Sequence, residues 1–549
     1  MDDSRLPESL TRRAVLRLTA LGVLASGLVP EFALAAKRRT VGLRGLSVRT
    51  RRPFKGDRRL LATVCPGSKG RKRAEIHFTL DRPALVQVEA VRTRQPKHPP
   101  VWSASARLPR GPHRFTWEPH PRTAPGTYLM RVTVEGSGRR KVYGGRRPAA
   151  VDFARAPVVR VLGVEAAFRA RSYAPGQLAR LRVSADAHVL ALQLFRSGPE
   201  EGNTNRPDEM KGVAMAPPRR IKWDKLRNRT GTITVRLGDW PSGLYFARLI
   251  TSDGRRGFAP FIIRPATFGA TSRVAVVLPT NTWQAYNFRD TDGDGWGDTW
   301  YAGGNPPVEL DRPFLNRGVP PFFRRYDLGF LRWLHATGKS PDFLSEEDLG
   351  RFDSEALRRI YDLVIFPGHT EYVTDHAYTI IEKFRDLGGN LIFLSANNFF
   401  WKVSRRGNQI RRVALWRNLG RPEVRVLGSQ YRANDDGKRQ GLFVVTGAEV
   451  APWFFSGTGL ANGSTIGDEI GGYGIEIDAT TLESPPATHV LAMIPDLFGV
   501  GVTAQMTYYE SPTGARVFNA GALDFGGSVW FCPPIRKLLE NLWQHMSQG

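Results

Sequence analysis

Polar side chains that can bind metals or transfer protons stand together directly after a short apolar run. The run Leu363–Phe366 has the length and composition of a buried strand. The polar residues that follow it are His369, Glu371, Tyr372, Asp375 and His376. Histidine and carboxylate side chains in such a cluster can act as general acids or bases, or as metal ligands. The alternative is that they are ordinary polar residues of a loop.

The residues after this cluster predict a helix and then a second strand. Thr374 is placed to cap the helix, and a pair of glycines ends it. The helix carries apolar residues at helical spacing, at Ile380, Ile381, Phe384 and Leu387. The second strand is Leu391–Leu394. Because the strands of such a unit are parallel and end at the edge where ligands bind, we expect His369, Glu371 and Asn397 to face one crevice.

A run of aspartates gives a second group of possible oxygen ligands. The run consists of Asp290, Asp292, Asp294 and Asp298, which have the spacing of a calcium loop. The twelfth position of an EF-hand loop, normally a glutamate, is Tyr301, and flanking helices are not evident. A loop that binds calcium and a plain acidic surface turn both fit this pattern.

The two cysteines argue against several mechanisms. Cys65 and Cys532 fall in different predicted domains, so neither a disulfide framework nor a cysteine zinc site is expected. Cys532 precedes two prolines and lacks the context of a nucleophile, and no G-x-S-x-G serine motif is present. Hydrolytic chemistry in this chain would therefore need a metal-bound or base-activated water.

Residues 1–36 have the pattern of a twin-arginine export signal. The motif lies at Thr11–Arg17, an apolar stretch follows it, and Ala33–Ala35 fits a cleavage site. The apolar stretch is short and interrupted by Arg17, which favours cleavage over a membrane anchor. We expect a protein that is secreted, periplasmic or associated with the cell envelope. Export of folded proteins by this route also raises the expectation of a bound metal.

The formal net charge of +28 is unevenly distributed along the chain. Between Lys37 and Arg160 there are about 30 basic and about 7 acidic residues. Export and the lack of a nucleic-acid-binding motif argue against nucleic acid as a partner. An anionic cell-envelope polymer or lipid surface suits the location better. The alternative is an arginine-rich composition with solvated surfaces.

A chain of 549 residues is too long for a single hydrophobic core, so several domains are expected. The spacing of apolar residues changes along the chain and indicates where these domains lie. Short alternating runs separated by turns predict two immunoglobulin-like β-sandwiches, over residues 37–155 and 156–268. The two modules share similar segments at Pro125–Arg131 and Pro241–Arg248, which supports two related sandwiches. Residues 269–549 alternate strands with helices, which predicts a doubly wound α/β domain.

The elements expected in the α/β domain can be placed from apolar runs. The strands are Val274–Leu278, Leu363–Phe366, Leu391–Leu394 and Arg516–Asn519, with a shorter one at Phe343-Leu344. The helices lie near Tyr326–Ala336 and Ile535–His545, in addition to the one after Thr374. The segment 403–510 is rich in glycine and arginine, and we expect it to hold insertions at the active edge of the sheet.

Six segments of the last domain form an ordered set: LPTNTWQAYN at 278–287, the Arg325-Tyr326-Asp327 helix start, PGHTEYVT at 367–374, GGNLIFLSANNFFW at 388–401, GDEIGG at 467–472 and ARVFNAGALDF at 515–525. On these segments, the chain from residue 272 onward resembles the C-terminal catalytic domain of the large subunit of N,N-dimethylformamidase. The fold implied by the resemblance is similar to a glutamine amidotransferase sheet that lacks the catalytic cysteine.

The resemblance also implies a mononuclear iron held by two tyrosines and one glutamate, which correspond to Tyr286, Tyr326 and Glu371. Phenolate and carboxylate oxygens suit ferric iron. If the sheet is parallel, these three residues can converge at its carboxyl edge. The alternative is that both tyrosines only pack and that their hydroxyls meet backbone partners.

By the same resemblance, catalytic support falls on His369, Asn397 and Glu469. We therefore predict an exported, iron-dependent hydrolase of a C–N bond that acts on a small amide by means of a metal-activated water. The alternative is a non-catalytic envelope-binding protein with a degenerate α/β domain and a basic, polymer-binding sandwich. The chain departs from the family in its acidic loop 290–298 and its two sandwiches, and shows no small subunit, so the substrate and the oligomeric state stay open.

Overall fold

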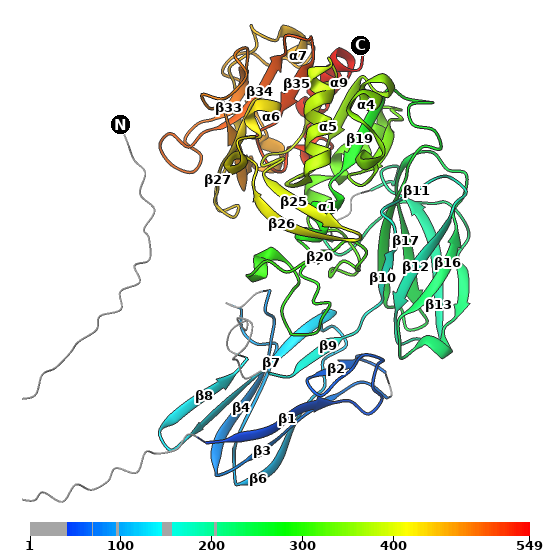
Figure 1. The fold of residues 1–549 in the computed structure, drawn as a ribbon, viewed down its shortest axis with the longest axis vertical. Helices are drawn as coiled ribbons and strands as arrows, with labels where there is room; N and C mark the ends of the chain where they lie inside the picture. The colour runs from blue at the N-terminus through cyan, green and yellow to red at the C-terminus, as the bar shows by residue number, and fades with distance from the viewer. Residues whose placement is uncertain (1–40, 69, 95–97, 145–155, 203–205, 549) are drawn as a thin grey trace, which may run out of the picture.

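The computed structural model describes residues 41–548, except residue 69 and the segments 95–97, 145–155 and 203–205. The expected export signal lies outside these described residues. Two β-sandwiches and one α/β domain follow one another along the chain. In Figure 1 the first sandwich lies at the bottom, the second to the right and the α/β domain at the top. No helix in the described part of the chain is long and apolar enough to cross a membrane.

The first sandwich packs a three-stranded sheet against a larger one. The smaller sheet has the order β1 (Leu43–Arg49), β3 (Ala74–Leu80), β6 (Gly111–Trp117). The larger has the order β2 (Leu61–Val64), β9 (Val158–Val161), β7 (Gly126–Gly136), β4 (Ala84–Val91), β5 (Trp102–Leu108), with β8 (Arg139–Tyr143) on β7. In β3 the apolar Ala74, Ile76, Phe78 and Leu80 alternate with polar residues and point into the core.

The second sandwich repeats this plan. One sheet has the order β10 (Glu165–Phe168), β12 (Leu178–Ser184), β16 (Gly231–Arg236). The other has the order β11 (Ser172–Tyr173), β18 (Arg256–Ile263), β17 (Gly243–Thr251), β13 (Val189–Arg196), β14 (Val213–Ala214), with β15 (Arg219–Lys222) on β13. A separate core fills the space between the two sheets.

The two similar segments found in the sequence occupy the same place in both sandwiches. Tyr128 is the third residue of β7 and donates a hydrogen bond from its hydroxyl to the carbonyl of Ala124 over 2.7 Å. Tyr245 is the third residue of β17 and donates in the same way to the carbonyl of Pro241 over 2.8 Å. This contact to the backbone four residues upstream is the tyrosine corner found in immunoglobulin-type sandwiches. The repeat therefore has a structural basis in both modules.

The boundary between the sandwiches differs from the expected one at residues 155 and 156. Strand β9 (Val158–Val161) pairs parallel with β2 and antiparallel with β7, so it belongs to the first sandwich. The sequence places Val158–Val161 at the start of the second module, but its pairing partners in the structure lie far away in the sequence. The first sandwich thus ends at Val161, and the second begins with β10 at Glu165.

The α/β domain is built on one long sheet with a parallel half and an antiparallel half. The parallel strands are β21 (Asp342–Ser345), β19 (Val274–Leu278), β22 (Leu363–Phe366), β24 (Asn390–Phe393) and β35 (Arg516–Asn519), in that order. The antiparallel extension continues with β34 (Ala504–Glu510), β33 (His489–Ile494), β29 (Phe443–Val445) and β30 (Thr465–Ile466). The segment expected only to hold insertions therefore supplies much of this sheet.

Helices cover both faces of the parallel half. The helices α4 (Ser354–Ile360) and α5 (Asp375–Asp386) pack on one face, and α3 (Leu328–Ala336) and α9 (Pro533–Met546) pack on the other. Strand β22 shows both faces, because Leu363 and Ile365 join one core while Val364 and Phe366 join the other. As expected, Thr374 caps α5 by accepting from the Ala377 amide over 3.3 Å.

Smaller elements surround the carboxyl edge of the parallel strands. The hairpin β25 (Trp401–Arg406) and β26 (Gln409–Leu415) forms a small sheet with β23 (Tyr372–Thr374) and β20 (Val308–Glu309). A two-stranded ribbon of β27 (Gln430–Asn434) and β32 (Glu476–Ala479) brings a distant part of the chain to the same edge.

The loop after Tyr286 joins the three domains. Arg289 forms a two-pronged ion pair with Glu165 of the second sandwich. Thr93 of the first sandwich donates a hydrogen bond to the carbonyl of Gly295 over 2.7 Å. Gly295 has a φ of 92°, and a Cβ there would come within 2.8 Å of Leu129, so glycine allows the loop to pack closely. The acidic loop in which the chain departs from the family thus connects the domains.

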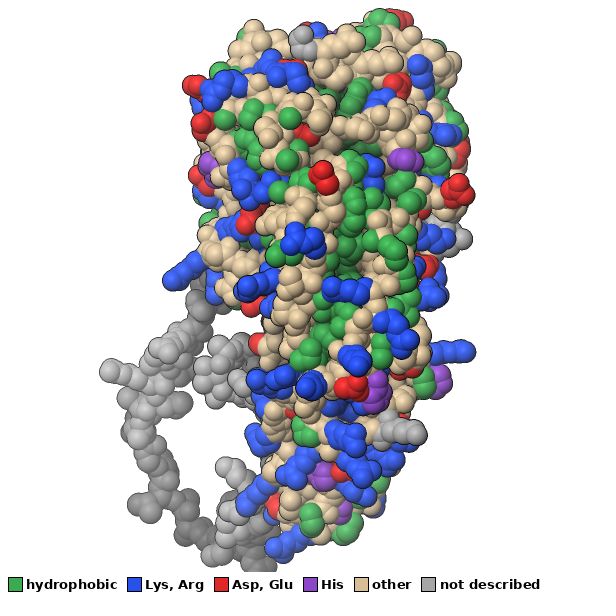
Figure 2. Space-filling view, turned by 90° about the vertical axis from the view of Figure 1, so that its right-hand side faces the viewer, with side chains coloured by type: hydrophobic (Ala, Val, Ile, Leu, Met, Phe, Trp, Pro, Cys, Tyr) green, Lys and Arg blue, Asp and Glu red, His purple; other side chains and the backbone are tan. Residues whose placement is uncertain are grey.

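The basic residues counted in the first sandwich are displayed on its surface. Figure 2 shows Lys and Arg side chains over the lower part of the molecule. Strand β8 is one source, since Arg139, Arg140 and Lys141 are all exposed.

Candidate functional site

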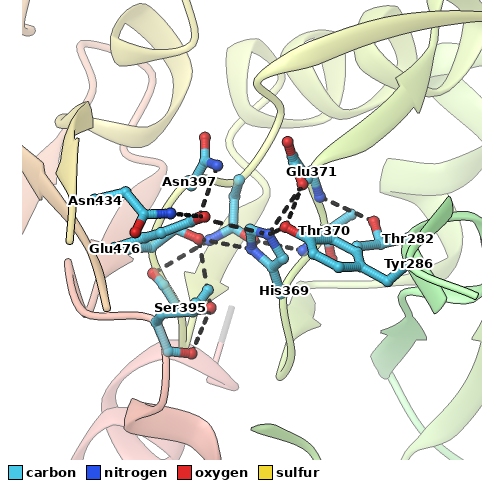
Figure 3. A network of polar contacts seen from close by, with 12 residues as sticks. Thr282, Tyr286, His369, Thr370, Glu371, Ser395, Asn397, Asn434 and Glu476 are labelled. Atoms are coloured by element: carbon cyan, nitrogen blue, oxygen red, sulfur yellow. Dashed lines mark hydrogen bonds and ion pairs between the residues drawn. The ribbon is translucent and has the colours of Figure 1, made fainter. Parts of the chain in front are cut away.

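The expected site residues come from loops at the carboxyl ends of three neighbouring parallel strands. Tyr286 ends the helix α1 (Thr280–Ala285), which follows β19. His369 and Glu371 follow β22, and Asn397 follows β24. Figure 3 shows their side chains pointing toward one another. Parallel strand order therefore explains how residues distant in the sequence meet.

One carboxylate oxygen lies at the centre of the cluster. Glu371 Oε2 accepts a hydrogen bond from the Tyr286 hydroxyl over 2.8 Å and lies 3.2 Å from His369 Nε2. The Tyr286 hydroxyl is itself 3.1 Å from the same histidine nitrogen. The prediction that Tyr286 and Glu371 bring their oxygens together is confirmed. The alternative, in which the Tyr286 hydroxyl meets only backbone, is wrong for this residue.

Two further tyrosines join this cluster. Tyr301 donates from its hydroxyl to Glu371 Oε2 over 3.1 Å and lies 2.6 Å from the Tyr372 hydroxyl. The rings of Tyr286 and Tyr301 stack with centroids 4.6 Å apart. From the sequence, Tyr301 appears only as a mismatch at the end of the acidic loop. The same mismatch is the signal that could have marked it as a site residue.

A second buried glutamate completes the polar network. Glu476 on β32 has Oε2 3.7 Å from His369 Nε2 and accepts from the Asn397 amide over 2.8 Å. Its other oxygen accepts from Asn434 over 2.9 Å. Asn397 is therefore linked to His369 through Glu476. Glu476 itself is a residue that sequence reasoning missed.

The reason Glu476 was missed lies in its local pattern. Glu476 and Asp478 alternate with Ile475 and Ile477, which normally predicts acids that face solvent. Here β32 pairs with β27 at the edge of the sheet, and both acids are buried. Asp478 accepts from the Asn397 backbone amide over 2.8 Å. Only the long-range pairing turns this acidic face inward.

Tyr326 borders the cluster without joining its hydrogen bonds. Its ring centroid is 6.4 Å from that of His369, and it stacks on Phe322 at 5.2 Å. Among the described residues, its hydroxyl has no hydrogen-bond partner. Burial raises the pKa of Tyr326 above its usual value, and the charge of Glu476 adds to this effect. The structure thus places Tyr326 beside the site, whereas Tyr301 makes the direct contact with Glu371.

Glu469 lies apart from this cluster. It belongs to the short 3-10 helix η5 (Asp468–Ile470), and its carboxylate accepts from the Cys532 thiol over 3.1 Å. Its contacts within the described chain do not include His369. Asp375 and His376 are also elsewhere, because both are exposed at the start of α5, where Asp375 pairs with Lys402. Glu476 is the second acid that the structure brings to the histidine.

The electrostatics of the cluster favour a proton on His369. His369 Nδ1 lies 3.0 Å from the carbonyl of Ala396 and donates to it, which directs Nε2 toward the carboxylates. Burial alone would lower the pKa of His369, but the hydrogen bond with Glu371 and the charge of Glu476 raise it above its usual value. Burial raises the pKa of Glu476 to about 7, although the nearby histidine opposes this shift.

The tyrosines are held in their neutral form by the same surroundings. Burial raises the pKa of Tyr286 well above its usual value, and the charges of Glu371 and Glu476 add to the effect. Tyr301 is 45% exposed as a residue, but its hydroxyl lies against Glu371, and desolvation of the hydroxyl together with the Glu371 charge raises the pKa of Tyr301 as well. Phenol and carboxylate oxygens therefore crowd a buried space in which His369 is the nearest positive group. A bound cation would relieve this imbalance.

The backbone around the cluster is fixed by side chains from neighbouring loops. The Thr282 hydroxyl accepts from the Glu371 amide over 3.0 Å, and the Asn398 side chain accepts from the Thr370 amide over 2.9 Å. Asn397 has a φ of 54°, a left-handed conformation that costs energy in a residue other than glycine. The hydrogen bond from the Asn397 backbone amide to the Asp478 carboxylate holds Asn397 in this conformation.

Three of the four aspartates of the acidic loop lie close together. Asp290, Asp292 and Asp294 each offer a carboxylate oxygen, and these oxygens lie within 4.8 Å of one another. Asp298 instead accepts from the Thr291 amide over 2.7 Å. Asp290 is buried, which raises its pKa to about 7, and the charge of Asp294 contributes.

The fold and the site define an α/β domain with a buried tyrosine, glutamate and histidine cluster at the carboxyl edge of its parallel strands. A family profile described as N,N-dimethylformamidase beta subunit-like, C-terminal, matches residues 195–533. The chain belongs to this family. The matched region begins inside the second sandwich and covers the whole cluster.

Two curated relatives carry the same name. The N,N-dimethylformamidase beta subunit of Paracoccus aminophilus is 22% identical over 402 residues, which covers 56% of this chain and 52% of the relative. The protein of the same name from Alcaligenes sp is 23% identical over 385 residues, with 53% and 50% covered. The chain thus spans about half the length of these relatives.

Among solved structures, a Salmonella alpha-2-macroglobulin aligns with a TM-score of 0.21 and 10% identity, over 43% of this chain and 17% of that one.

Proposed function

We propose that this protein is an iron-dependent hydrolase of the C–N bond of an amide. The family relationship supports amide hydrolysis, because the curated relatives are named as dimethylformamidase subunits. The observation that carries the proposal is the convergence of Tyr286, His369 and Glu371 at one point, with 2.8 Å between the tyrosine and glutamate oxygens. Residues 1–36 would direct its export.

The donor atoms of the cluster fit a ferric ion. Tyr286 and Glu371 supply hard oxygen ligands, and the family resemblance adds Tyr326 as the third. The phenol proton that now bridges Tyr286 and Glu371 would be released on metal binding. When bound, the ion would polarise the amide carbonyl and lower the pKa of water.

The residues around these ligands are arranged to hold and move a proton. His369 is fixed through Nδ1 and presents Nε2 to Glu371 and Glu476. Glu476, with its pKa near 7, can exchange a proton with this histidine at neutral pH. The pair could thus deliver a proton to the departing amine. Asn397 and Asn434 hold the Glu476 carboxylate in place for this role.

The proposal is tested by following amine release from a panel of formamides and acetamides with the mature, iron-loaded protein. We expect turnover that falls at least about 100-fold in His369→Asn. The control is His335→Asn, because His335 lies exposed at the end of α3, away from the cluster. An absence of turnover on every amide, with iron bound, would contradict the proposed reaction.

We also propose that calcium binds the aspartate loop and stabilises its contacts with the two sandwiches. The support is the grouping of Asp290, Asp292 and Asp294, together with the packing of this loop against both sandwiches. Calcium accepts six to eight oxygen ligands, so backbone carbonyls or water would complete the set.

A further inference from the structure

A cavity of about 600 Å³ opens where the three domains meet. Arg94 comes from the first sandwich, Pro207 from the second, and the α/β domain supplies residues that include Arg324 and Asp524. Junctions between domains are common places for small-molecule sites. The size of the cavity exceeds what a molecule of a few heavy atoms needs, so a larger ligand fits it better.

One aromatic ring separates this cavity from the tyrosine and glutamate cluster. Phe322 lines the cavity, and its ring packs edge-on against Tyr286 at 5.9 Å and face-on against Tyr326 at 5.2 Å. The Phe322 residue is 47% exposed, and its backbone has a left-handed φ of 59°. A molecule in the cavity would therefore reach the cluster by passing this ring.

The polar side of the cavity is positively charged. Its charged lining residues are three arginines, Arg94, Arg324 and Arg325, and one acid, Asp524. Asp524 is already paired with Arg325 over 3.0 Å. Arg94 contacts the Asn316 amide oxygen and the Phe288 ring, neither of which is charged.

Arg324 is the freest of these cations. It is exposed, and among the described residues its guanidinium has neither a hydrogen bond nor an ion pair. The remaining wall of the cavity is largely apolar, with Phe322, Phe323, Ile470 and Phe531. An anionic group beside an apolar body complements this surface, and arginine binds carboxylates through two parallel hydrogen bonds.

We propose that the cavity binds amide substrates that carry a carboxylate on an apolar body, and that Arg324 contacts this carboxylate. The amide would then extend past Phe322 toward Glu371. The identity of the ligand as a substrate rests on the proposed amide hydrolysis. The charge preference of the cavity does not rest on it, so the two can be tested separately.

The first test measures binding without turnover. The full mature chain is titrated by calorimetry with 3-phenylpropionate and with 3-phenylpropan-1-ol, which share a body but differ in charge. We expect the carboxylate to bind at least about tenfold more tightly, and Arg324→Gln to remove this difference. The control is Arg180→Gln, an exposed arginine on β12 of the second sandwich, which should change neither affinity. Equal binding of the two ligands, or an unchanged preference in Arg324→Gln, would overturn the proposal.

The second test measures turnover of N-formylphenylalanine and its neutral counterpart N-formylphenylalaninamide, followed as formate release. Arg324→Gln should raise KM for the charged substrate by about tenfold and leave kcat and the neutral substrate unchanged. If neither compound is hydrolysed while 3-phenylpropionate still binds through Arg324, the proposed reaction fails and the anion site stands. If both are hydrolysed with equal KM, the reaction stands and the anion site is refuted.

Discussion

The Tyr286 hydroxyl lies 2.8 Å from Glu371 Oε2, although 85 positions separate these residues in the sequence. They lie close together because β19 and β22 are adjacent parallel strands: Tyr286 ends the helix that follows β19, and Glu371 lies in the loop that follows β22. The same oxygen meets Tyr301 and His369. Glu371 therefore organises the site, and changes at its partners should separate the roles of metal binding and proton transfer.

The first prediction concerns the third oxygen ligand. If the ligands are Tyr286, Tyr326 and Glu371, then Tyr326→Phe should lose iron, whereas Tyr301→Phe should retain it. Iron content is measured by mass spectrometry on purified protein. The control is Tyr378→Phe, a buried tyrosine that bonds the Arg421 carbonyl instead. The opposite pattern would assign the third ligand to Tyr301, which makes the direct contact with Glu371.

A second prediction concerns Glu476. Glu476→Gln removes a carboxyl that faces His369 but keeps an oxygen to accept from Asn397. We expect iron content to be unchanged and kcat to fall about 10²-fold, because the variant can bind but cannot exchange a proton. Glu469→Gln, next to Cys532, should leave kcat close to that of the wild type. A normal kcat in Glu476→Gln would remove this glutamate from the mechanism.

The third prediction concerns the ion pair between Glu165 of the second sandwich and Arg289 of the loop after Tyr286. The side chains of Glu165 and Arg289 are 9% and 12% exposed. Removing one partner leaves the other as a buried charge without a counter-charge. Glu165→Gln should lower the free energy of unfolding by about 3 kcal/mol at pH 7. The matched control is Glu355→Gln. Glu355 pairs with Arg359, and because their side chains are 76% and 63% exposed, the loss of this pair should change the free energy of unfolding little.

The ion pair between Glu165 and Arg289 also predicts how the free energy of unfolding changes as the pH falls. Burial opposes ionisation of Glu165, but the Arg289 guanidinium outweighs it and holds the pKa of Glu165 below its usual value. The folded state therefore binds fewer protons, and the stabilisation is present above the usual glutamate pKa and is lost as the pH falls through the lower, folded pKa. The stability gap between wild type and Glu165→Gln should close in acid, as measured by chemical denaturation. A gap that widened below pH 4 would contradict this.

The fourth prediction tests calcium in the aspartate loop. A chelator should lower the thermal midpoint of the wild type, because calcium at about 100 times its Kd adds about 2.7 kcal/mol of stability. Asp292→Asn, at the outer face of the loop, should have a lower midpoint that no longer responds to the chelator. A chelator response that persists unchanged in Asp292→Asn would place the calcium elsewhere.

Much of the central sheet could be predicted from the sequence. Val274–Leu278 and Leu363–Phe366 are short apolar runs whose residues are all buried, and Arg516–Asn519 has an apolar centre at Val517-Phe518, so these segments mark the strands to the residue. Parallel strand order predicts that Tyr286 and Glu371 can converge, whereas the choice of Tyr286 as a site residue comes from the family resemblance. These features depend on local composition and on a general rule of topology.

Other features depend on pairings that a local pattern does not contain. The sequence alone does not assign strand β9 to one sandwich; its pairing with β2 and β7 places it in the first. Glu476 looks solvent-facing until β32 pairs with β27 and turns it inward. Tyr301 reaches Glu371 only because the loop before it folds against the sandwiches. Each miss reflects a contact between segments that lie far apart in the chain.

The most direct test of the account is the iron content and visible absorption of the purified mature protein. Tyrosinate bound to ferric iron should give about one iron per chain and a charge-transfer band, and both should disappear in Tyr286→Phe and in Glu371→Gln. A colourless, iron-free wild-type protein that hydrolyses amides at full rate would contradict the account. Iron that persists in both variants would contradict it equally, because the metal would then lie away from the Tyr286 and Glu371 oxygens.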